Sequence, residues 1–171
     1  MNKRGQFFLI AALAIIVVIA SLVAIYNSAE KGKEEVSTFN LAEEINFEGS
    51  QILKNGVYNS LPFSEIGERI ENLTDYYAKT NRETDLLIVY SDEIQTVIIF
   101  YNNTGTEIEV SPSSFQPASI DNKFSSTQAR TDDILVTISG QTYRETLRPG
   151  KIFMAFAMKN RNGERFVALP N

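Results

Sequence analysis

One apolar stretch near the N-terminus constrains this chain more than any other feature. Residues 7–26 read FFLIAALAIIVVIASLVAIY and carry no charge, with Ser21 as the only polar interruption. As a helix, the stretch would be about 30 Å long, which matches the hydrocarbon core of a bilayer. A buried helix of a soluble protein is the alternative, but such helices are rarely apolar on every face over this length. The sequence therefore predicts a membrane-spanning helix.

The residues that flank this stretch predict its orientation. Lys3 and Arg4 precede it, whereas the acidic and basic residues that follow it nearly balance. Positive charge favours the cytoplasmic side, so we expect Met1 in the cytoplasm and the chain beyond Tyr26 outside the cell. A secretory signal peptide is a second interpretation, but its apolar region is usually about 7–15 residues long and ends at a small-x-small cleavage site. No clean site of that kind follows the stretch.

The residues just before the apolar stretch resemble a known processing signal. Residues 2–8 read NKRGQFF and continue directly into the apolar run, which is similar to the class III signal peptide of archaeal type IV pilin-like proteins. In that family a prepilin peptidase cuts after a small residue that follows a basic pair, and the cut commonly leaves Gln as the first mature residue. The resemblance implies a cut between Gly5 and Gln6, with the apolar helix retained on the mature protein.

The same resemblance implies a filament subunit. The processed helix would leave the lipid and bundle in a filament core with copies of itself or with other pilin-like subunits, and a β-rich head would lie outside the cell. Bacterial-type pilins carry Glu five residues into the mature chain, where this sequence has Ile10, so a carboxylate that registers neighbouring subunits is not expected. The alternative is a single-pass membrane protein whose outer β domain binds a partner or a glycan without forming a filament.

Two helical segments are expected after the apolar stretch. Residues 27–60 are polar but compatible with a helix, and their apolar side chains could pack on the globular domain or line an amphipathic stalk. Glycines within this segment predict bends or a break, with Asn55-Gly56 as the expected stop, because each Gly costs about 1 kcal/mol relative to Ala in a helix. Residues 64–79 form the second segment, where apolar side chains recur at helical spacing and predict a core-facing amphipathic helix.

A β domain is expected over residues 85–170, because the period of the apolar residues changes to two. The expected strands are residues 86–90, 94–101, 106–110, 134–139, 142–147, 152–159 and 165–169. Most of these seven strands are joined by short turns, which favours an antiparallel β-sandwich or a strongly twisted sheet. The polar stretch 111–131 is expected to be a long surface loop. The fold class is therefore α+β.

The chain divides into four expected parts. These are a signal peptide over residues 1–5, a transmembrane or filament-core helix over 6–26, a helical extension over 27–60 and an extracellular head over 61–171.

Composition excludes several classes of function. The chain has no Cys, His or Trp, which removes disulfides, Cys/His zinc sites and triads that need an imidazole base. Its formal net charge of -5 disfavours nucleic-acid binding. The acidic pairs Asp92-Glu93 and Asp132-Asp133 offer oxygen ligands, but neither lies in a D-x-D-x-D-G loop. We therefore expect no enzyme activity, no bound metal and no cofactor.

Two N-x-[ST] sequons are present, at Asn72 and Asn102. If the chain beyond Tyr26 lies outside the cell, both are possible N-glycosylation sites.

Overall fold

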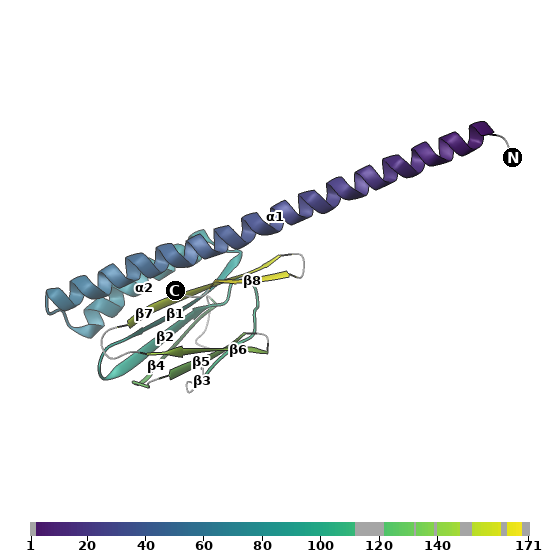
Figure 1. The fold of residues 1–171 in the computed structure, drawn as a ribbon. Helices are drawn as coiled ribbons and strands as arrows, with labels where there is room; N and C mark the ends of the chain where they lie inside the picture. Colours follow the sequence, from purple (N-terminus) through teal and green to yellow (C-terminus); the bar gives the residue numbers. More distant parts are fainter. Residues whose placement is uncertain are drawn as a thin grey trace. The chain divides into compact units, whose positions relative to one another are not determined.

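The computed structural model describes an α+β protein, which confirms the fold class (Figure 1). It describes residues 3–111, 122–131, 133–138, 140–147, 152–161 and 164–168, with the backbone alone for residues 3–11 and 161. The helices are α1 (Lys3–Tyr58) and α2 (Phe63–Thr80). The strands are β1 (Thr84–Ser91), β2 (Gln95–Tyr101), β3 (Ile108–Ser111), β4 (Lys123–Ala129), β5 (Asp133–Ile138), β6 (Gln141–Thr146), β7 (Ile152–Arg161) and β8 (Glu164–Ala168).

The chain forms two compact units, Met1–Ser37 and Thr38–Asn171. The described part of the first unit is the N-terminal part of α1. The second unit, called the head below, contains the rest of α1 together with α2 and the strands.

Helix α1 continues through Gly32, Gly49 and Gly56, so the break expected within it is wrong. It ends at Tyr58, where Leu61 N–H donates to the carbonyl of Gly56 at 2.8 Å and Ser60 N–H donates to that of Val57 at 3.0 Å. Ser60 has a φ of 54°. This pair of bonds around a left-handed residue is a Schellman motif, which satisfies the last carbonyls of the helix.

Helix α2 is one residue longer at each end than the expected segment 64–79. It follows Pro62 at the N-cap, whose fixed φ suits a helix start. Ile66, Ile70 and Tyr77 are buried on the face that was expected to point at the core. The prediction of a core-facing amphipathic helix is confirmed.

The strands form two antiparallel sheets among the described residues. The larger sheet has the order β4-β2-β1-β7-β8 and the smaller has the order β3-β5-β6. Strand β4 lies inside the stretch expected to be a surface loop, which is a correction of that prediction. It pairs with β2 from Gln95↔Ala129 to Tyr101↔Lys123. Its sequence, KFSSTQA, is mostly polar because it forms an edge strand whose side chains remain partly exposed.

Two apolar cores place these elements in three layers within the head. One core lies between the helices and the five-stranded sheet, where Ile45 of α1 and Ile70 of α2 meet Ile88 of β1. The other lies between the two sheets, where Val89 of β1 meets Val136 of β5. Figure 1 shows α2 on one side of the large sheet and β3, β5 and β6 on the other. Since both faces of β1 are covered, every residue of this strand is buried.

Candidate functional site

The N-terminal part of α1 is long and apolar enough to cross a membrane, and it is the one such helix in the described part of the chain. Its large side chains are exposed, with Leu13 at 61% and Ile25 at 66%. Ser21 directs its hydroxyl back to the carbonyl of Val17 at 2.8 Å. That bond satisfies the hydroxyl within the helix, so Ser21 adds little polarity to the apolar surface.

The two residues of the expected processing site, Gly5 and Gln6, lie within α1, near its start. The structure places them on the N-terminal side of the apolar run, as the sequence requires.

The sequon at Asn72 lies on α2. Asn72 is exposed, but Thr74, which supplies the hydroxyl of the sequon, is fully buried. The Thr74 Oγ1 lies 2.9 Å from the Tyr101 hydroxyl and 3.2 Å from the carbonyl of Glu71. The hydroxyl of this sequon is therefore part of the contact between α2 and β2.

The sequon at Asn102 lies in the turn after β2. The Asn102 Oδ1 accepts the Gly105 N–H at 2.7 Å, and the Thr104 hydroxyl donates to the buried carboxylate of Asp85. Asn103 donates from Nδ2 to the carbonyls of Ala78 at 3.2 Å and Thr84 at 2.9 Å. Hydrogen bonds therefore hold the whole turn in one conformation.

The acidic pairs are used in local structure. Asp92 Oδ1 accepts the N–H groups of Ile94 and Gln95, each at 2.8 Å, and so shapes the turn between β1 and β2. Asp133 pairs with Arg144 at 2.5 Å across β5 and β6, and this contact lowers the pKa of Asp133. Asp132 lies outside the described residues. Within the described ranges, no three acidic side chains are grouped where they could hold a metal ion.

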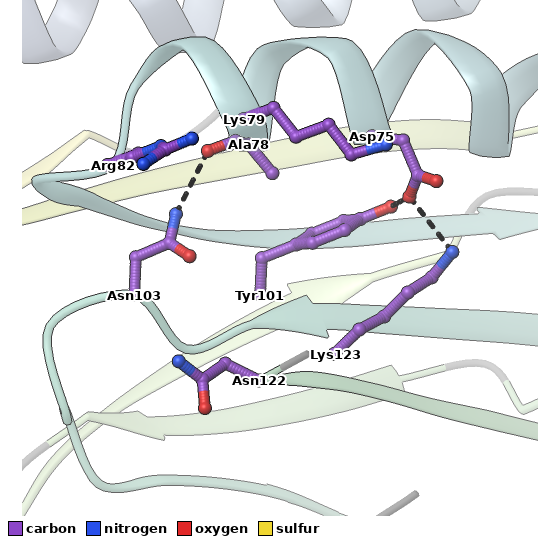
Figure 2. Close-up of a pocket in the computed structure, with 8 residues that line it drawn as sticks. All are labelled: Asp75, Ala78, Lys79, Arg82, Tyr101, Asn103, Asn122 and Lys123. Atoms are coloured by element: carbon purple, nitrogen blue, oxygen red, sulfur yellow. Dashed lines mark hydrogen bonds and ion pairs between the residues drawn. The ribbon is translucent and has the colours of Figure 1, made fainter. Parts of the chain in front are cut away.

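A pocket of about 420 Å³ lies on the head, between the end of α2 and the adjacent ends of β2 and β4 (Figure 2). Its lining residues are Asp75, Ala78, Lys79, Arg82, Tyr101, Asn103, Asn122 and Lys123. Six of them carry charged or amide side chains, so polar groups line the pocket beside the apolar parts of these residues, Ala78 and Tyr101.

One side of the pocket is a network around Asp75. Its Oδ1 accepts the Tyr101 hydroxyl at 2.6 Å and the Lys123 ammonium at 3.0 Å. Burial alone would raise the pKa of Asp75, but the bonds from Tyr101 and Lys123 outweigh burial and hold this pKa below its usual value. Burial and the Asp75 carboxylate raise the pKa of Tyr101. Lys123 also pairs with Glu71 at 3.1 Å. The positive charge of Lys123 is therefore balanced by the carboxylates of Asp75 and Glu71.

The other cations of the lining, Lys79 and Arg82, are exposed. Neither forms an ion pair with any part of the chain that the structure describes. Lys79 lies in the last turn of α2 and Arg82 follows the C-cap residue Asn81, and the helix dipole favours positive charge at this end. The pocket therefore has a net positive side in a chain whose formal net charge is -5.

Sequence reasoning missed this pocket. Its residues come from α2, the segment after it, the end of β2 and the start of β4, and no fixed spacing joins them. Because β4 was expected to be a loop, Lys123 was not expected beside Asp75. The only available signal was the pair of cations near the predicted end of α2.

Comparisons with known proteins give no match for this chain: no protein-family model, no curated protein and no solved structure matches it.

Proposed function

We propose that the protein is a pilin-like structural subunit of an extracellular surface filament that assembles through the apolar part of α1. The observation that supports this proposal most is the continuity of α1. One helix runs from Lys3 to Tyr58, and it carries both an exposed apolar segment and the residues Ala42, Ile45 and Leu53 of the head core. A subunit that assembles through an apolar segment needs that segment joined to its head, and α1 provides this covalent connection.

The proposal includes a topology and a processing step. Lys3 and Arg4 stay in the cytoplasm, the apolar segment crosses the membrane before assembly, and the head lies outside. A prepilin peptidase cuts between Gly5 and Gln6 and removes both positive charges. The helix then leaves the lipid and packs with copies of itself or other pilin-like subunits. Asn72 and Asn102 are possible N-glycosylation sites of the external head.

The test compares two substitutions at one position. In Gly5→Phe, the ring should not fit a peptidase site that accepts a small residue, so Lys3 and Arg4 remain. Moving either charge to the bilayer centre costs about 2.5–3.5 kcal/mol, which holds the helix at the cytoplasmic interface. In Gly5→Ala, the residue stays small and processing should continue.

Mass spectrometry of the N-terminus and the yield of sheared surface filaments measure the two steps. We expect the Gly5→Ala protein to begin at Gln6 and to appear in filaments. The Gly5→Phe protein should keep its first five residues and remain in the membrane fraction. Gly5→Phe protein in sheared filaments at the normal level would overturn the proposal.

A second candidate function is a membrane-anchored surface protein whose head binds a partner without forming a filament. The observation that favours it is the positively charged pocket, since assembly through α1 does not require one. Wild-type cells that contain the uncut protein and no filaments would support this candidate.

A further inference from the structure

We propose that the pocket between α2, β2 and β4 binds a carboxylated sugar. This inference goes beyond assembly, because it concerns a ligand site on the head. It rests on the charge of the pocket, its amide groups and its size.

The charge of the pocket selects an anion. Asp75 already receives hydrogen bonds from Tyr101 and Lys123. Lys79 and Arg82 add two positive charges to the lining; Lys79 attracts Asp75 at longer range, but no described carboxylate forms an ion pair with either cation. A ligand carboxylate beside Arg82 can accept two parallel N–H bonds from the guanidinium group, which is the strongest form of this contact.

The amide groups select a ligand with hydroxyls. The Asn103 Nδ2 is held by two backbone carbonyls, of Ala78 and Thr84. This fixes the orientation of the amide, and Figure 2 shows its oxygen directed towards Tyr101, into the pocket. Asn122 contributes a second amide beside it. Amide oxygens accept hydrogen bonds and amide nitrogens donate them, and sugar hydroxyls can do both.

The size of the pocket favours a sugar acid over a simple inorganic anion as the ligand. A volume of about 420 Å³ lies in the range of small-molecule sites, about 300–1,000 Å³. An inorganic anion would contact the cations and leave the amides unused. An apolar ligand would strip water from the charged and amide groups of the lining without replacing their hydrogen bonds.

The test is titration calorimetry on the full chain in detergent micelles, with sodium glucuronate as the probe. Glucose is the neutral control of the same ring size, and sodium sulfate is the control for a simple anion. The double variant Lys79→Gln/Arg82→Gln removes both unpaired cations. Lys54→Gln/Arg69→Gln is its matched control, because it removes one Lys and one Arg from exposed positions outside the pocket. Thermal melts of all proteins confirm that each is folded.

We expect saturable binding of glucuronate to the wild type and to the control variant, and at least tenfold weaker binding to Lys79→Gln/Arg82→Gln. Glucose should bind at least tenfold more weakly than glucuronate. Equal binding of glucuronate to both double variants, or no binding to the wild type, would overturn the proposal. Sulfate that binds as tightly as glucuronate and competes with it would reduce the pocket to a simple anion site and would also overturn the proposal.

Discussion

Gly49 shows how the lack of one side chain sets the distance between α1 and the sheet. A Cβ added to Gly49 would lie 2.1 Å from the Phe153 Cζ, which is closer than any real contact. A Cβ added to Gly56 would lie 2.4 Å from the Ile66 Cγ1 of α2. The two glycines that suggested helix breaks therefore let α1 approach β7 and α2 closely. Their cost in helix propensity is offset by the packing that they permit.

We expect the free energy of unfolding of Gly49→Ala to be lower than that of Gly32→Ala by about 1–3 kcal/mol, because both changes gain helix propensity but only the methyl group at position 49 overpacks the core against Phe153. Chemical denaturation of the protein in micelles, followed by circular dichroism, measures the change. Gly32→Ala is the matched control, since no atom lies within 4 Å of a Cβ built there. A further change of Phe153→Leu should recover part of the loss in the Gly49→Ala protein. Equal stability of the Gly49→Ala and Gly32→Ala proteins would contradict this account.

Asp75 should make the stability of the head depend on acid. Its pKa is below the usual value in the folded state, so the carboxylate stabilises the fold above the unfolded pKa of about 4, and this contribution is lost as the pH falls through the folded pKa. We expect the wild-type melting temperature to fall more steeply than that of Asp75→Asn below pH 4. Thermal melts from pH 6 to pH 2.5 provide the comparison. Parallel curves for the two proteins would show that Asp75 does not contribute.

At the scale of elements, Asn46 of α1 makes the backbone hydrogen bonds of a neighbouring strand at the edge of β7. Strand β8 pairs with β7 only from Ala157 to Arg161, which leaves the earlier part of that edge without a strand partner among the described residues. Asn46 covers this edge at Ala155: its Nδ2 donates to the Ala155 carbonyl at 3.0 Å, and its Oδ1 accepts the Ala155 N–H at 2.7 Å. The side-chain amide thus makes both bonds that a neighbouring strand would make.

We expect Asn46→Ala to destabilise the head by about 1–3 kcal/mol, because it leaves the N–H and the carbonyl of the buried Ala155 unsatisfied. Asn40→Ala is the matched control on an exposed position of the same helix. Amide hydrogen exchange should show faster exchange at Ala155 in the Asn46 variant and no change in the control. Unchanged exchange at Ala155 would mean that Asn46 does not protect this edge.

Elements with a clear apolar period or a bounded apolar run could be predicted from the sequence, and elements with neither could not. Helix α2 follows from its helical spacing, and the buried strands β1, β2 and β7 follow from short, nearly continuous apolar runs. Strand β4 carries polar side chains, so its pairing with β2 depends on backbone bonds that a sequence pattern does not record. The pocket was not predictable for the same reason, since the pairing of β4 brings Lys123 to Asp75.

At the scale of the whole molecule, α1 belongs to both compact units. Residues 38–58 lie in the same unit as the sheets, and Ala42, Ile45 and Leu53 are almost completely buried there. From the sequence, the apolar side chains of residues 27–60 were expected either to pack on the globular domain or to line a stalk. The three buried apolar residues show that the C-terminal part of this segment packs on the domain. Without these residues, one face of the five-stranded sheet would lose part of its cover.

We expect a chain that starts at Thr38 to fold cooperatively and one that starts at Leu61 to fail. The shorter chain lacks the buried apolar side chains Ala42, Ile45 and Leu53 of α1 and the Asn46 bonds to β7. Thermal melts followed by circular dichroism should show a sharp transition for residues 38–171 and a broad one for residues 61–171. A sharp transition at similar temperature for both chains would show that α1 is dispensable for the head.

The continuity of α1 also bears on where a protease could separate the head from the apolar segment. Proteases preferentially nick exposed loops, where the chain is free to adopt an extended form. Residues 3–58 are a single helix, so no loop lies between the apolar segment and the first buried residues of the head. Release of the head by shedding would require a protease to unwind part of this helix first. The head and the apolar segment therefore should be lost or retained together.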